Sequence, residues 1–198
     1  MSKIPTRALL VVDVQNDFCL AQPGFAYYDR QAMEKRDDLS PIVDTFDKGI
    51  SPLIEQSRKL GLQVIFVKSA YGEGQFADMS RLCIPGTEGS DFYMVKPLNH
   101  EKVFEKHGHN PFESNQELGQ HLNKNGSSTI LVAGFTTDNC ISRTAYGALY
   151  FSITPIVLGD CVSTAGYKRE DWHIKKLREF EEHRFIGLLN SSNLEFHP

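Results

Sequence analysis

The chain has 198 residues, which suits one α/β domain, and a content of 40% hydrophobic and 23% charged residues is typical of a soluble globular protein. Its formal net charge of -4 gives no electrostatic attraction to nucleic acid or to an anionic membrane, so we expect neither as a partner. No apolar run reaches the length that a transmembrane helix needs.

The four cysteines are widely spaced and form no CxxC pair, which indicates reduced thiols and not a disulfide framework. Residues 1–5 lack the apolar segment of a signal peptide. Together these two features predict a cytoplasmic protein.

Short apolar runs predict buried strands, and amphipathic stretches between them predict helices. The expected elements, in chain order, are strand 8–14, helix 40–60, strand 62–68, a short edge strand 92–96, a strand end at 103–104, helix 114–125, strand 129–133, helix 139–150, strand 153–158, helix 169–182 and strand 185–189. Gly61 ends the first long helix, and Ser114 with Glu117 forms a capping box for the second. The glycine-rich loop 69–88 is long enough to indicate a functional loop.

Strands and helices alternate along the whole chain, which predicts a single domain over residues 1–198. We expect an α/β fold of three αβα layers, built on a doubly wound, mostly parallel, Rossmann-like sheet. Such sheets place their sites beyond the carboxyl ends of the strands. The residues that follow each predicted strand are therefore the candidates for function.

The first strand ends in Val12-Asp13-Val14-Gln15-Asn16-Asp17-Phe18. No GxGxxG follows it, so we expect no dinucleotide cofactor. Asp13 interrupts an apolar run, and a buried carboxylate needs a cation, hydrogen-bond donors or a proton. A structural aspartate bonded to turn amides and a functional one are both compatible with this position. An EF-hand is excluded because Phe18 stands where that loop requires glycine.

Lys106 follows the apolar pair 103–104, so it is a candidate strand-end partner for Asp13, with a solvated lysine as the alternative. His107 and His109 lie just beyond it. No further side chain completes a recognisable metal-ligand spacing around them, so we expect a solvated loop and no metal.

Cys140 is expected in the first turn of a helix just after the third core strand. Free amides and the helix dipole at such a position favour a thiolate and can receive an oxyanion. The alternative is a buried cysteine that packs as a small hydrophobe. The polar residues 136–139 before it are a poor composition for a core, which favours the reactive role.

Taken together, the strand ends resemble the isochorismatase-like cysteine hydrolases. This family includes nicotinamidases, N-carbamoylsarcosine, biuret and ureidoacrylate amidohydrolases, and isochorismatase itself. The resemblance runs from about residue 7 to residue 163. It rests on four motifs that occur in the family's order. They are residues 12–18, the segment Ile84-Pro85-Gly86-Thr87-Glu88-Gly89, Lys106 followed by Pro111-Phe112, and residues 134–145.

The resemblance implies a catalytic triad of Asp13, Lys106 and Cys140. It also implies a cis peptide bond between Phe135 and Thr136, and an oxyanion hole formed by the backbone amides of Thr136 and Cys140. In the implied reaction Asp13 takes the thiol proton, the sulfur attacks an amide or carbamoyl carbonyl, and ammonia or an amine leaves. Water, activated by the same carboxylate, then hydrolyses the thioester. The family further implies a small amide substrate and a homo-oligomer, either a dimer or a tetramer. We expect no cofactor.

Two departures from the family narrow the expected reaction. Nicotinamidases carry an Asp-x-His pair and further histidines after the second strand, where they bind a metal, and no such set occurs in 67–73. True isochorismatases cleave a vinyl ether without a nucleophilic cysteine, so Cys140 argues against that reaction. A non-catalytic binding member of the fold stays open, whereas a phospho-receiver would need an aspartate at the end of strand 129–133.

The substrate pocket is expected from residues close to these motifs. The candidate walls, each with core packing as the alternative, are Phe18, Tyr71, Phe112, Phe135 and Asn139. Arg30, Lys68 or Arg81 would bind a substrate carboxylate, and the sequence does not choose among them. Segment 23–38 is expected to close over the pocket of its own subunit or that of a neighbour.

Overall fold

The computed structural model describes residues 8–33, 39–77, 79–164 and 169–194. Their strands form one six-stranded sheet in the order β3-β2-β1-β4-β5-β6, and every neighbouring pair is parallel. The strands are β1 (Ala8–Val12), β2 (Gln63–Ser69), β3 (Lys102–Lys106), β4 (Thr129–Phe135), β5 (Thr154–Ser163) and β6 (Gly187–Leu189). This is the doubly wound order, in which the strand sequence reverses direction between β1 and β4. The predicted fold class is confirmed.

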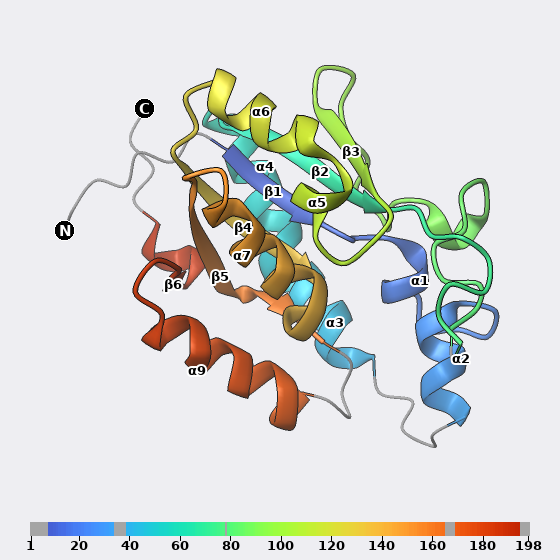
Figure 1. Ribbon diagram of the computed structural model, residues 1–198. Coiled ribbons are helices and arrows are strands. Elements are labelled where there is room, and N and C mark those ends of the chain that lie inside the picture. The colour runs from blue at the N-terminus through green and yellow to red at the C-terminus, as the bar shows by residue number, and fades with distance from the viewer. Residues whose placement is uncertain (1–7, 34–38, 78, 165–168, 195–198) are drawn as a thin grey trace.

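Helices cover both faces of the sheet (Figure 1). The α-helices are α1 (Asn16–Cys19), α2 (Ala26–Met33), α3 (Ser40–Thr45), α4 (Ser51–Lys59), α5 (Pro111–Ser114), α6 (Gln116–Lys124), α7 (Ser142–Leu149) and α9 (Lys175–Glu182). Figure 1 shows α5, α6, α7 and α9 on one face and α3 and α4 on the other. In the described part of the chain, no helix combines the length and the apolar character needed to cross a bilayer.

The central strand β1 explains why two helical layers are needed. All five of its residues are buried, and successive side chains point to opposite faces. Leu9 and Val11 join a core cluster with Ile42 and Ile54 from α3 and α4. Leu10 and Val12 belong to a second cluster on the other face, which contains Leu118, Leu122, Ala145 and Phe180. A continuous apolar strand is the pattern expected when both faces are covered.

Two predicted local features are wrong. Residues 92–96 form no strand, and Phe92 makes only an isolated bridge with Gln15. The cap of α6 is Asn115, whose side chain accepts a hydrogen bond from the Glu117 amide at 3.1 Å, and not Ser114. Pro111 starts the short helix α5, which ends at Ser114, so the capping position moves one residue along the chain.

The predicted helix 40–60 consists of α3, a π-helical segment (Phe46–Ile50) and α4, and Gly61 follows it with φ +71° as a helix stop requires. Gly134 has φ +127°, and a Cβ atom there would lie 1.9 Å from the carbonyl oxygen of Val12. Only glycine therefore lets the end of β4 approach β1 this closely. The same approach brings the residues after both strands together.

Candidate active site

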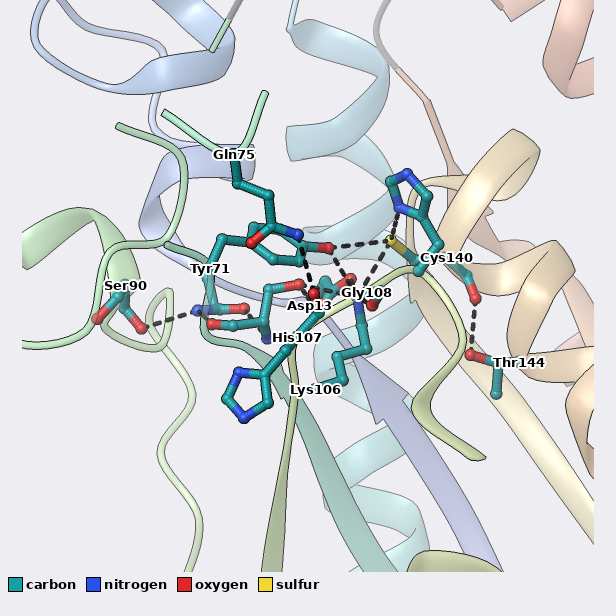
Figure 2. Close-up of polar contacts among 12 residues, drawn as sticks. Asp13, Tyr71, Gln75, Ser90, Lys106, His107, Gly108, Cys140 and Thr144 are labelled. Atoms are coloured by element: carbon teal, nitrogen blue, oxygen red, sulfur yellow. Dashed lines mark hydrogen bonds and ion pairs between the residues drawn. The ribbon is translucent and has the colours of Figure 1, made fainter. Parts of the chain in front are cut away.

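Three strand ends bring Asp13, Lys106 and Cys140 together in a buried cluster (Figure 2). Asp13 directly follows β1, Lys106 ends β3, and Cys140 lies in the π-helical segment Thr137–Ile141 after β4. The ammonium nitrogen of Lys106 lies 2.9 Å from Oδ2 of Asp13 and 3.3 Å from the sulfur of Cys140. The polar cluster thus sits where the strand order reverses, at the place where doubly wound sheets bind ligands.

Lys106 is fully buried, so it is not the solvated lysine of the alternative interpretation. Its ammonium donates to the hydroxyls of Ser69 and Tyr71, at 2.8 and 3.0 Å, and to the carbonyl of Gly108 at 3.1 Å. Burial lowers the pKa of Lys106, but the negative charge of Asp13 and the neighbouring Cys140 and Tyr71 raise that pKa well above its ordinary value. These neighbours therefore favour the cationic form of Lys106 inside the protein.

Asp13 is held by its backbone and by Ser69. Its φ of 54° lies in the left-handed region, and its amide donates to the carbonyl of Val67 at 2.9 Å. Oδ1 accepts a hydrogen bond from the Ser69 hydroxyl at 2.8 Å, while Oδ2 faces Lys106. Ser69 thus joins the carboxylate to the ammonium, a role that the sequence interpretation missed although Ser69 ends β2.

Gln15 and Asp17 stabilise the surrounding loops and lie outside the reactive cluster. The Gln15 side chain accepts from the Ser69 amide at 2.8 Å and donates to the carbonyls of Ser69 and Ser90 at 3.0 and 2.9 Å. Asp17 accepts from the amides of Ala26 and Cys83 at 3.0 and 2.6 Å. Both are therefore structural, and Gln15 fixes the backbone that carries Ser69.

The surroundings of Cys140 favour its protonated thiol. Burial, then the negative charge of Asp13, raises its pKa to about 12, while the positive charge of Lys106 acts in the opposite direction. Burial and the charge of Asp13 thus oppose the thiolate that the free amides at the helix start favour. Any nucleophilic role requires that the proton leave during the reaction, and Asp13 is the adjacent base.

Replacing Asp13 by asparagine is expected to lower the pKa of Cys140, because the change removes a negative charge and keeps the Lys106 cation. Alkylation of Cys140 by iodoacetamide at pH 8 should therefore be faster in the variant than in the wild type. The rate is measured against pH by mass spectrometry of the Cys140 peptide. Cys161, whose pKa is also raised to about 12 but by burial and Asp160, is the internal reference. An unchanged Cys140 rate would contradict this electrostatic account.

Two further side chains approach the sulfur, and the sequence interpretation assigned neither to the reaction. The Nδ1 atom of His109 lies 3.6 Å from Sγ of Cys140, and the Tyr71 hydroxyl lies 4.0 Å from it. The expected solvated loop is thus wrong for His109, which is half-buried and stacks on Phe76 at 5.6 Å between ring centroids. His107 is exposed, and its Nδ1 contacts the carbonyl of Ala70 at 2.7 Å.

The peptide bond between Phe135 and Thr136 is cis, at the position that the resemblance implies. The Thr136 carbonyl accepts hydrogen bonds from the amides of Asn139 and Ile141 at 3.2 and 3.1 Å, which ties the turn to the following helix. Thr144 donates to the Cys140 carbonyl at 2.6 Å and secures the first helical turn. An oxyanion hole from the amides of Thr136 and Cys140 stays a prediction.

The predicted pocket walls separate into two groups. Tyr71 reaches the cluster, whereas Phe18, Phe112 and Phe135 are buried in the two core clusters. Asn139 is half-buried and donates to the carboxylate of Asp138 at 3.4 Å. A role in substrate binding stays a prediction for all five.

Two of the three candidate carboxylate binders have described side chains. Lys68 lies over the ring of Phe92 at 5.7 Å, and Arg81 is exposed. The side chain of Arg30 and residues 34–38 lie outside the described part of the chain. Within segment 23–33, Tyr27 packs against Phe18 of the same subunit, with ring centroids 5.2 Å apart.

The residues after β2 do not suit a resident metal ion. Among the described residues, no group of three or more His, Cys, Asp or Glu side chains is placed to hold one. Ser69 and Tyr71 both accept hydrogen bonds from Lys106, so the oxygen atoms at this strand end already bind a cation of the chain itself.

Comparison with known proteins adds sequence relatives. The model of the isochorismatase domain matches residues 7–190. A nicotinamidase/pyrazinamidase of Mycobacterium tuberculosis is 30% identical over 177 residues, which cover 81% of this chain and 87% of that protein. The isochorismatase family protein YddQ of Bacillus subtilis is 27% identical over 186 residues, or 93% of this chain and 92% of the relative.

Solved structures show the same fold. A pyrazinamidase of Pyrococcus horikoshii in complex with zinc has a TM-score of 0.74 at 22% identity, covering 94% of this chain and 99% of that one. An N-carbamoylsarcosine amidase from Thermoplasma acidophilum has a TM-score of 0.73 at 24% identity, covering 96% and 99% of the two chains. At these identities the structural likeness concerns the fold alone.

Proposed function

The chain belongs to the isochorismatase family of hydrolases, and from that premise we propose that it is a cysteine-dependent amidohydrolase. The proposed substrate is a small amide, carbamoyl or ureido compound whose C–N bond is cleaved through a thioester. The observation that carries this proposal is the buried contact of Cys140 with Lys106, which is itself paired with Asp13. A thiol, a carboxylate base and a fixed cation are the groups that nucleophilic acyl transfer requires.

In the proposed acylation step, Asp13 takes the proton of Cys140 as the sulfur bonds to the carbonyl carbon of the substrate. The Lys106 cation stabilises the sulfur while its negative charge develops, at the observed 3.3 Å. The carbonyl oxygen becomes an oxyanion, for which the backbone amides of Thr136 and Cys140 are the proposed donors. Asp13 then passes its proton to the departing nitrogen, so the C–N bond breaks and ammonia or an amine leaves.

A nicotinamidase or pyrazinamidase activity is the second candidate, because a relative at 30% identity carries that name. The absence of a metal-ligand group among the described residues argues for other amides first. An isochorismatase-type reaction would leave the contact between Cys140 and Lys106 without a role. A non-catalytic binding role would leave the whole buried cluster unexplained. We further propose that the protein is cytoplasmic, that it forms a homo-dimer or homo-tetramer, and that it uses no cofactor.

A panel of small amides tests the reaction class. Nicotinamide, pyrazinamide, N-carbamoyl amino acids, biuret, ureidoacrylate and oxamate are incubated with the purified protein, and released ammonia is measured. We expect at least one to be hydrolysed, and mass spectrometry of a rapidly quenched sample to show an acyl group on Cys140. The proposal would be contradicted if an amide is hydrolysed but no acyl group is found on Cys140. Continued turnover after complete alkylation of the Cys140 thiol would confirm that contradiction.

A further inference from the structure

The environment of Cys140 raises a question about the second half of the reaction. Hydrolysis of a thioester must return a proton to the sulfur and remove one from the attacking water. Asp13 is fully buried, and its two oxygens face Ser69 and Lys106. A group that exchanges protons between the sulfur and solvent must be close to the sulfur and more accessible than Asp13.

His109 is that group. It lies on the loop between β3 and α5, its side chain is half-buried, and its Nδ1 atom lies 3.6 Å from the sulfur of Cys140. Its ring therefore touches both the reacting atom and the solvent side of the cluster. Neutral imidazole has one donor and one acceptor nitrogen, so the same ring can take a proton and give it back.

The position of the His109 ring is fixed by aromatic packing. Phe76 stacks on His109 with an interplanar angle of 29°, and it packs edge-on against Tyr71 at 4.8 Å between centroids. Tyr71 is held in turn by the ammonium of Lys106 at 3.0 Å. The loop residue Phe76 thus clamps the two rings that approach the sulfur, and this limits the directions in which Nδ1 can point.

We propose that His109 is a catalytic residue for hydrolysis of the thioester, the acid–base group of deacylation, whereas Asp13 serves acylation. The inference rests on the proposed function and assigns a separate residue to its second step. The water oxygen bonds to the thioester carbonyl carbon while its proton passes to Nδ1 of His109. The C–S bond then breaks and the proton moves from Nδ1 to the sulfur. The products are the free thiol and the acid, so atoms and electrons balance.

The charges around His109 favour its neutral form. Burial, then the positive charge of Lys106, lowers the pKa of His109, and Arg143 of α7 acts in the same direction. Asp13 and Asp138 oppose them. Deacylation needs unprotonated Nδ1, so its rate should fall only when the pH drops through this lowered pKa. The raised pKa of Cys140 supports the same assignment, because a sulfur of high basicity leaves more easily when it is protonated.

The test separates the two half-reactions with p-nitrophenyl acetate, an activated ester that does not depend on the natural substrate. The burst of p-nitrophenolate reports acylation, and the steady rate reports deacylation. His109→Asn keeps a polar atom near the Nδ1 position but cannot carry the proton, and His109→Phe keeps the stacking on Phe76 without a nitrogen. We expect both variants to keep the burst rate within about threefold and to lose on the order of 10²-fold in the steady rate. The acetyl group should then accumulate on Cys140.

The matched control is His107→Asn, which changes the neighbouring exposed histidine and should behave like the wild type. In the His109 variants the steady rate should no longer decrease as the pH falls through the pKa of His109. The burst rate should keep the pH dependence that it has in the wild type. The inference is overturned if His109→Asn turns over like the wild type, if burst and steady rates fall together, or if His107→Asn is equally slow. Failure of the proposed function itself would give a different result. If Cys140 is not the nucleophile, the burst of p-nitrophenolate would survive in Cys140→Ala.

Discussion

Replacing Cys140 by alanine is expected to lower kcat/KM for any amide that the wild type hydrolyses by a factor of about 10⁴ or more. Alanine removes the sulfur and leaves the charged pair of Lys106 and Asp13 in place. Nothing else in the proposed reaction can form the covalent intermediate, so the residual rate should come from binding and oriented water alone. The measurement is ammonia release at several substrate concentrations, with mass spectrometry of the quenched enzyme.

The control for this variant is Cys161→Ala. Cys161 is also fully buried and its pKa is also raised to about 12, but its neighbour is Asp160 and it lies in β5, away from Lys106. We expect Cys161→Ala to keep the wild-type kcat. If Cys140→Ala still hydrolyses the same amides at a comparable rate, the nucleophile has been wrongly assigned. If both alanine variants lose activity alike, the effect comes from core packing and not from the chemistry of one thiol.

Replacing Lys106 by methionine is expected to lower the free energy of unfolding by about 3–5 kcal/mol and to abolish amide hydrolysis. The variant leaves Asp13 charged and fully buried, without the Lys106 cation and with the Ser69 hydroxyl still donating to Oδ1. It also removes the cation that opposes the rise in the pKa of Cys140, so the thiol becomes harder to deprotonate. Urea unfolding followed by circular dichroism measures the first effect, and ammonia release the second.

The double variant Asp13→Asn/Lys106→Met separates the effect of the buried charges on stability from the effect of side-chain size. It removes both charges and keeps side chains of similar size, so it should recover most of the stability that Lys106→Met loses. It should stay inactive, because neither the base nor the cation is present. A loss below about 1 kcal/mol in the single variant, or a double variant no more stable than the single one, would show that the buried ion pair does not control folding.

Much of the fold could be predicted because the sequence pattern is local. The continuous apolar run that became β1 and the alternation of strands with helices are set by hydrophobic burial and periodicity, which depend on residues close together in the chain. The errors came where a neighbouring element decided the outcome. Asn115 caps α6 because α5 ends just before it, and residues 92–96 make no ladder because Phe92 meets only Gln15.

In the candidate site, too, some residues could be predicted from the local sequence and others only from contacts between distant elements. Cys140 stands out in the sequence as a lone cysteine after a polar run, whereas Asp13 and Lys106 were assigned their roles by the family resemblance. Ser69 and His109 gave no such signal, since a serine and a loop histidine are common on solvated surfaces. Only the meeting of β1, β2 and β3 places Ser69 between a carboxylate and an ammonium at 2.8 Å from each.

The sequence by itself determined the order of strands and helices and the residue types available at each strand end. Only the tertiary structure decided the surroundings that shift the pKa values of Lys106, His109 and Cys140. It buried Cys140 beside Asp13, which raises the thiol pKa to about 12. It also carried His109 to 3.6 Å from that sulfur. Burial and the distances between charges set a pKa, and both arise from parts of the chain that are far apart in sequence.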